Sequence, residues 1–181
     1  MFRLSFLKIW LPLAITITFL SGLIYLVVQQ DIRIGANDPQ IQIAEDIASQ
    51  LANGQNPQYF MPLTKTDISK SLANYVMFFN QDGGLISSSA SLEGKSPTVP
   101  QGVFITTKQN HETRFTWQPQ AGVRSAVVAI YYKGAKPGFV LVGRSLREIE
   151  IRENQQEMIV LMGWTVTMLM SLSSVFIINK I

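Results

Sequence analysis

Two long runs of the chain carry no charged side chain. Residues 9–28 contain no Asp, Glu, Lys, Arg or His, and neither do residues 158–178. An α-helix rises about 1.5 Å per residue, so about 20 apolar residues cross the roughly 30 Å hydrocarbon core of a bilayer. The pattern predicts two transmembrane helices, 9–28 and 158–178, with residues 1–8 and 179–181 as short tails.

The first run could also be a cleaved signal peptide, because a short basic segment precedes it. Its uncharged length exceeds the roughly 7–15 residues of a signal-peptide core. No small-x-small cleavage pattern appears near Leu26 to Gln30. These features favour an uncleaved anchor.

Between the two runs, residues 29–157 have the mixed pattern of one small folded domain. Its first element is a helix over about 39–53. Asp38 suits the cap position and Pro39 the first helical position, and Asn53-Gly54 follows as a stop signal. Apolar residues recur at spacings of three and four, which gives the helix one buried face: Ile41, Ala44, Ile47, Ala48 and Leu51.

Five segments then have strand character, being rich in β-branched and aromatic residues or alternating in polarity. Asn80–Gly84 is a tight-turn signal between the first two, and 133–138 connects the last two. A short helical turn is expected at 66–72, and 103–109 is either a short helix or an irregular crossing. The pattern predicts an α+β domain with a five-stranded antiparallel sheet, its strands at 74–79, 85–89, 112–118, 123–132 and 139–142.

A last helix joins this domain to the second apolar run. Ser145 and Glu148 have the spacing of a capping box, and neither Pro nor Gly occurs from there to Gly163. We therefore expect one continuous helix over 146–178. Such a helix is either a plain anchor or a rigid connection that carries a signal.

Charge indicates the orientation in the membrane. Residues 29–157 hold 12 basic and 12 acidic residues, so the net charge of +3 comes from Arg3, Lys8 and Lys180. Basic flanks remain on the cytoplasmic side, which predicts cytoplasmic termini and a periplasmic or extracellular domain. The excess of basic residues thus indicates the orientation in the membrane, and no nucleic-acid partner is expected. The absence of Cys fits this placement.

The order helix, strand–turn–strand, crossing, three strands and exit helix resembles that of the PAS-like extracytoplasmic sensor domains called Cache or PDC domains. The nearest local likeness is the segment 76–89, VMFFNQDGGLISSS, followed by Ser91-Leu-Glu-Gly-Lys95. Segments 122–128 and 138–148 resemble the family's last two strands and exit helix. The resemblance implies a bacterial two-span sensor in the cell inner membrane. Only three residues follow the second run, so no cytoplasmic output domain is expected within this sequence.

Catalytic and metal-binding patterns are missing from the sequence. The chain has no Cys and a single His, and it contains no nucleophile, phosphate-loop or zinc-protease motif. His111 and Glu112 form a lone adjacent pair, which is too little for a metal site. We therefore expect no enzyme activity, no cofactor and no metal.

A ligand pocket is the more plausible kind of site. Two arginines on successive strands could bind a carboxylate through their forked donors, and aromatic side chains could enclose it. In the alternative, the arginines are solvated or paired with Glu112 or Glu93. The candidate ligand-binding residues are Arg114, Arg124, His111, Trp117 and Tyr131.

Small residues recur every four positions in both apolar runs, a spacing that lets helices pack closely in lipid. It favours packing of one run on the other, or a homodimer. The residues are Ala14, Thr18 and Gly22 in the first run and Gly163, Thr167 and Ser171 in the second.

The sequence as a whole favours a membrane-anchored sensory or regulatory module. It would bind a small ligand or a protein and signal through a membrane partner such as a kinase. The alternative is a structural or assembly protein whose outer domain is a docking surface.

Overall fold

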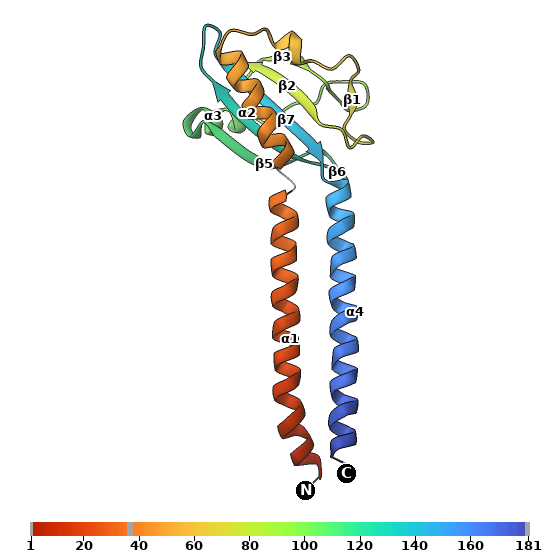
Figure 1. Cartoon of the computed structure of the whole chain (residues 1–181). Coiled ribbons are helices and arrows are strands. Elements are labelled where there is room, and N and C mark those ends of the chain that lie inside the picture. Colours follow the sequence, from red (N-terminus) through yellow and green to blue (C-terminus); the bar gives the residue numbers. More distant parts are fainter. Residues whose placement is uncertain (1, 36–37, 180–181) are drawn as a thin grey trace. The chain divides into compact units, whose positions relative to one another are not determined.

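The computed structural model describes residues 2–35 and 38–179 and divides into two units. One unit is a helix pair drawn from residues 1–33 and 150–181, and the other is an α+β domain over Ile34–Ile149 (Figure 1). Asn37 and Lys180 lie outside the described residues, as do the side chains of Arg3 and Asp38.

The helix pair consists of α1, Phe2–Gly35, and most of α4, Arg147–Ile178. Both helices are long and apolar enough to cross a membrane, and only 6% of the most apolar window of each is buried. Large apolar side chains such as Phe19, Leu161 and Leu169 are exposed. An apolar helix buried in a soluble core would show the opposite burial, so neither run is a core helix of this chain.

Within this pair, each helix turns one narrow stripe of side chains toward the other. The less exposed positions recur at spacings of three and four, the pattern of antiparallel helices that share one seam. Arg33 Nε lies 3.3 Å from Glu153 Oε1 across the seam. The stripe on α1 includes Ala14, Ile17, Ser21, Tyr25, Val28 and Ile32, and that on α4 includes Gln156, Val160, Trp164, Met168, Ser171 and Val175.

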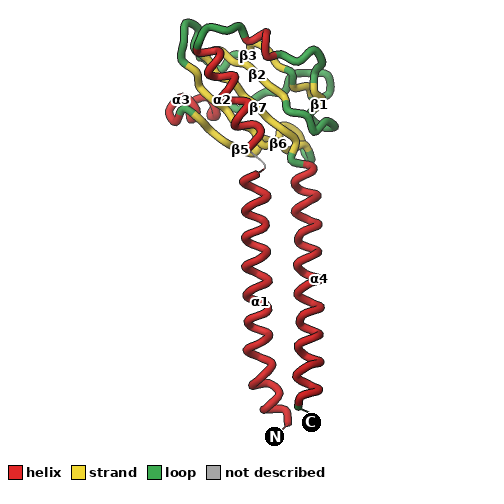
Figure 2. Tube along the Cα trace, viewed as in Figure 1, coloured by secondary structure: helices red, strands yellow, loops and turns green. Residues whose placement is uncertain are grey.

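The domain is built on a five-stranded sheet in which all neighbouring strands are antiparallel, as predicted (Figure 2). The strand order is β3-β2-β7-β6-β5. A separate pair of two-residue strands, β1 and β4, is parallel. The strands are β1 Thr66–Asp67, β2 Tyr75–Asn80, β3 Leu85–Ser88, β4 Ala90–Ser91, β5 Glu112–Gln120, β6 Val123–Tyr132 and β7 Gly138–Ser145.

Helix α2, Asp38–Ala52, covers one face of the sheet (Figure 2). It contributes Ala44, Ile47, Ala48 and Leu51 to a core with side chains of β2, β6 and β7. The predicted helix and its buried face are confirmed. So is its end, because Gly54 has a φ of +91°, a left-handed conformation that glycine adopts without a steric penalty.

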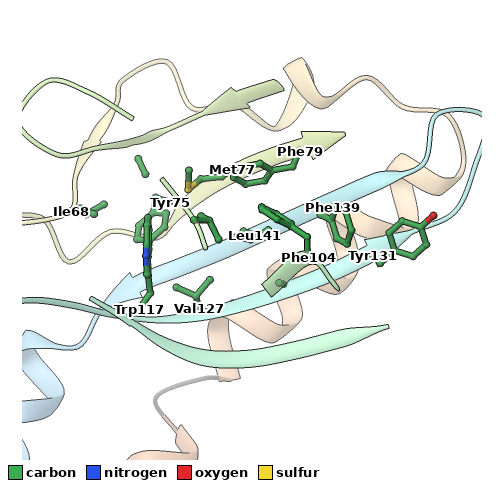
Figure 3. Packing of buried hydrophobic residues seen from close by; sticks show 13 residues of the cluster. Ile68, Tyr75, Met77, Phe79, Phe104, Trp117, Val127, Tyr131, Phe139 and Leu141 are labelled. Atoms are coloured by element: carbon green, nitrogen blue, oxygen red, sulfur yellow. The ribbon is translucent and has the colours of Figure 1, made fainter. Parts of the chain in front are cut away.

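The opposite face of the sheet carries an aromatic core. Helix α3, Gln101–Asn110, inserts Phe104 between Phe79 and Phe139, with ring centroids 4.8 and 5.1 Å apart (Figure 3). Tyr75, Trp117 and Leu141 lie in the same buried cluster. The segment 103–109, which the pattern left open, is therefore helical.

The last strand leads almost directly into α4. Strand β7 ends at Ser145 and α4 begins at Arg147. The Ser145 hydroxyl, at the end of β7, accepts a hydrogen bond of 3.3 Å from the backbone N–H of Arg147, the first residue of α4. α4 then continues unbroken to Ile178, as predicted.

Candidate functional site

The two arginines proposed for a ligand pocket lie on the face of the sheet that α2 covers. Arg114 pairs in register with Val128, whose side chain belongs to the α2 core. Arg124 lies four positions earlier on the same strand and therefore shares that face. Both side chains are exposed. The Arg114 guanidinium forms an ion pair with the Glu112 carboxylate, which is the alternative anticipated for it.

The aromatic residues proposed with them lie on the opposite face. Trp117 and Tyr131 belong to the aromatic core (Figure 3). The Tyr131 ring packs 5.0 Å from that of Phe139, and the ammonium of Lys108 lies 5.8 Å from the Tyr131 ring centre. The arginines and these aromatic side chains therefore do not face a common space.

His111 ends α3 and is exposed, with a φ of +72°. Its backbone carbonyl accepts a hydrogen bond from the Tyr131 N–H. His111 and Tyr131 do share the lining of one open hollow of about 490 Å³, together with Glu45, Glu112 and Lys133. Two of the five candidate ligand-binding residues, His111 and Tyr131, thus line the same hollow, which also has acidic and basic side chains in its lining.

A second hollow of about 530 Å³ lies where the β2–β3 and β6–β7 turns meet the end of α2. Its position follows from the register, because Asn80 at the end of β2 pairs with Gly138 at the start of β7. The lining residues are Leu51, Gly54, Gln55, Asn56, Pro57, Gln58, Asn80, Ile86, Ser87, Tyr132, Ala135, Lys136 and Pro137.

Two hydroxyl groups in this lining are notable. Ser87 Oγ is buried and has no hydrogen-bond partner among the described residues. The Tyr132 side chain crosses over Gly138, and burial raises the pKa of its phenol. The phenol therefore remains a neutral group that can donate a hydrogen bond.

Sequence reasoning missed this second hollow. Its residues come from three segments, 51–58, 80–87 and 132–137, which the pattern identified only as a helix end and two turns. The signal that could have found it is the pairing of β2 with β7, because that pairing places both turns at one end of the sheet.

The small residues in the helix pair have mixed positions. Ala14 and Ser171 lie in the seam between α1 and α4, and Thr18 Oγ1 accepts a hydrogen bond of 3.0 Å from Trp164 Nε1. Gly22 and Gly163 are exposed, and a side-chain carbon added to either glycine would have no neighbour within 4 Å. Thr167 is also exposed and bonds to its own helix backbone.

No group of three or more His, Cys, Asp or Glu side chains is suitably placed for a metal ion within residues 2–35 and 38–179. No protein-family model and no curated protein matches the chain. The two units and the hollows of the sheet domain are therefore the features from which a function can be inferred.

Proposed function

We propose that this chain is a membrane-anchored sensory or regulatory module. α1 and α4 span a bacterial inner membrane, and the sheet domain lies outside the cytoplasm, where it binds a small ligand or a protein. The observation that carries this proposal is that the sequence of one sheet domain is flanked by two exposed apolar helices.

Burial supports the membrane part of the proposal. Both helices carry exposed apolar side chains. Removing a Leu, Ile, Val or Phe side chain from water lowers the free energy by about 1.5–3 kcal/mol. A bilayer supplies that environment along the two uncharged runs, 9–28 and 158–178.

The order of elements supports the sensory part. α2, the β2–β3 hairpin, α3, strands β5 to β7 and α4 follow in the order on which the resemblance to Cache domains is based. Only one residue separates β7 from α4. A change in the central strands therefore has a short covalent route into the second span and from there to a membrane partner such as a kinase.

Engineered cysteines test the topology cleanly, because the chain has none of its own. Lys95→Cys places a thiol on the sheet domain and Ser5→Cys places one near the N-terminus. In intact cells, a membrane-impermeant maleimide should label the first variant only. After permeabilisation, both should react to the same extent. Labelling of Ser5→Cys in intact cells, or recovery of the chain in the soluble fraction, would refute the proposal.

An exposed edge favours docking of a protein as a second function. β3 is an outer strand of the sheet, and its Leu85 and Ile86 side chains are exposed. Unpaired backbone groups on an edge strand can bind an extended segment of another chain. Crosslinking from a photoreactive group at Leu85 to a second membrane protein in cells would support this function.

A further inference from the structure

The hollow at the β2–β3 and β6–β7 turns is lined by positive charge and by no acidic side chain. Lys136 is the one charged residue among the thirteen that line it. It forms no ion pair with any residue that the structure describes. A carboxylate bound here would meet an available ammonium group and no competing acid.

Two of the four side-chain amides in the lining, Asn56 and Asn80, use their oxygens as acceptors within their own turns. The Asn56 side-chain oxygen already accepts from the Gln58 backbone N–H at 3.0 Å. The Asn80 side-chain oxygen accepts from the backbone N–H groups of Asp82 and Gly84, at 3.0 and 2.7 Å. An amide oxygen has two lone pairs, so the Asn80 oxygen is fully engaged by its own turn and the Asn56 oxygen is partly engaged. The NH₂ groups of both side chains are left as donors.

The two hydroxyl groups add to this supply of donors. Ser87 Oγ lacks a partner among the described residues, although buried hydroxyls normally have one. A phenol with the ordinary pKa of about 10 is protonated at neutral pH, and burial raises the pKa of Tyr132 further. A ligand that offers only acceptors would complement both groups.

The rest of the lining is apolar. Leu51, Pro57, Ile86 and Pro137 contribute aliphatic surface. The volume of about 530 Å³ falls within the roughly 300–1,000 Å³ of pockets that hold small organic molecules. A ligand for this site therefore needs an apolar body as well as an acceptor group.

We propose that this hollow binds a small organic carboxylate. The carboxylate contacts Lys136 and the neighbouring donors, and the apolar body lies against Leu51 and Ile86. This inference depends on the proposed function, since it names the ligand class of the sheet domain.

The test uses the full chain in nanodiscs of neutral phosphatidylcholine, with 4-fluorobenzoate as the probe. Binding is followed by broadening of its ¹⁹F resonance. 4-Fluorobenzylamine and 4-fluorobenzyl alcohol are the cationic and neutral comparison probes. Empty nanodiscs correct for partition into lipid.

Lys136→Gln should weaken 4-fluorobenzoate binding by about tenfold, because one charge-assisted hydrogen bond contributes roughly 1.5 kcal/mol or more. Lys95→Gln is the control. It removes the same charge from an exposed side chain of the sheet domain, and Lys95 lines neither of the two hollows. The affinity of this variant for 4-fluorobenzoate should equal that of the wild type.

Three results would overturn the inference: no binding at millimolar probe, equal binding of the amine, or equal losses in both lysine variants. The maleimide labelling pattern separates this failure from that of the proposed function. An intact two-span topology without carboxylate binding refutes the ligand class alone. Binding by a chain that does not enter membranes refutes the proposed function alone.

Discussion

The Tyr75 ring fills the space in which a side chain at position 143 would lie. Tyr75 and Gly143 face each other across β2 and β7, and a side-chain carbon on Gly143 would come within 2.7 Å of Tyr75 Cε2 and closer still to its hydroxyl end. Tyr75 is only 1% exposed and packs beside Trp117 (Figure 3). Its ring therefore has little room to move aside.

Gly143→Ala should consequently lower the free energy of unfolding by about 1–3 kcal/mol, the usual cost of overpacking a core. Chemical denaturation of the full chain in detergent, followed by near-UV circular dichroism, measures this. Gly102→Ala is the control, because nothing lies within 4 Å of its added carbon and alanine is the better helix former. Equal losses in the two variants would contradict the packing argument.

Burial of Tyr75 also predicts a pH dependence. Desolvation raises the pKa of its phenol in the folded state, so the folded chain retains the proton where the unfolded chain releases it. This contribution to stability is complete below about pH 10 and declines above it by about 1.4 kcal/mol per pH unit.

Tyr75→Phe should remove that decline, so that wild type loses more stability than the variant between pH 9 and pH 11. Denaturation midpoints at each pH measure the difference. Tyr59→Phe is the control, because Tyr59 is 82% exposed. The explanation fails if Tyr59→Phe alters the pH profile as strongly as Tyr75→Phe does.

The sequence predicts which side chains are buried better than it predicts which side chains meet. Phe115 and Trp117 alternate with polar residues along β5 and so share one face, and both belong to the aromatic core or pack against it. The same alternation places Arg114 on the other face, so a pocket combining it with Trp117 was geometrically excluded. The lining of the larger hollow could not be predicted, because it depends on which strands are neighbours.

Among the elements, α3 buries two side chains, Phe104 and Thr107, and of these only Phe104 belongs to the aromatic core. Phe104 is 5% exposed, whereas its neighbour Ile105 is 62% exposed. Phe104→Ala should lower the free energy of unfolding by about 3–5 kcal/mol, as is typical when a buried Phe is truncated. Ile105→Ala on the same helix should change it by less than about 0.5 kcal/mol. Thermal unfolding of the two variants in detergent distinguishes these values, and similar midpoints would contradict this role of Phe104.

Most elements could be predicted, because their patterns are local. The segment 123–132 was predicted as a strand and is one, and α2 begins and ends within about one residue of the prediction. α3 was harder, since it has only two buried residues, Phe104 and Thr107, and follows Pro100. The pair β1 and β4 was missed, because a two-residue parallel pairing leaves no periodic signal.

For the molecule as a whole, the two apolar helices were the simplest prediction, because the length of a run and its lack of charge are read directly from the sequence. α1 extends beyond the predicted 9–28, to Phe2–Gly35. Polar residues at its ends continue the helix, so a search for uncharged residues could not set those bounds.

A charge inside the apolar part of α4 tests whether that helix lies in lipid. Leu169 is 59% exposed, so Leu169→Arg should be tolerated in water but should cost about 2.5–3.5 kcal/mol at the centre of a bilayer. The expected result is a clear fall in the fraction that resists carbonate extraction from membranes. Leu169→Phe should retain wild-type extraction. Unchanged extraction of the arginine variant would count against a spanning α4.

Two glycines of β7, Gly138 and Gly143, suggest how relatives of this chain could be recognised. Tyr75 of β2 covers Gly143 on one face of the sheet, and Tyr132 of β6 covers Gly138 on the other. An aromatic ring over a cross-strand glycine restores the contacts that the glycine lacks. Each pair should therefore evolve jointly: a lineage that enlarges the residue at 143 should also shrink the one at 75, and positions 138 and 132 should covary in the same way.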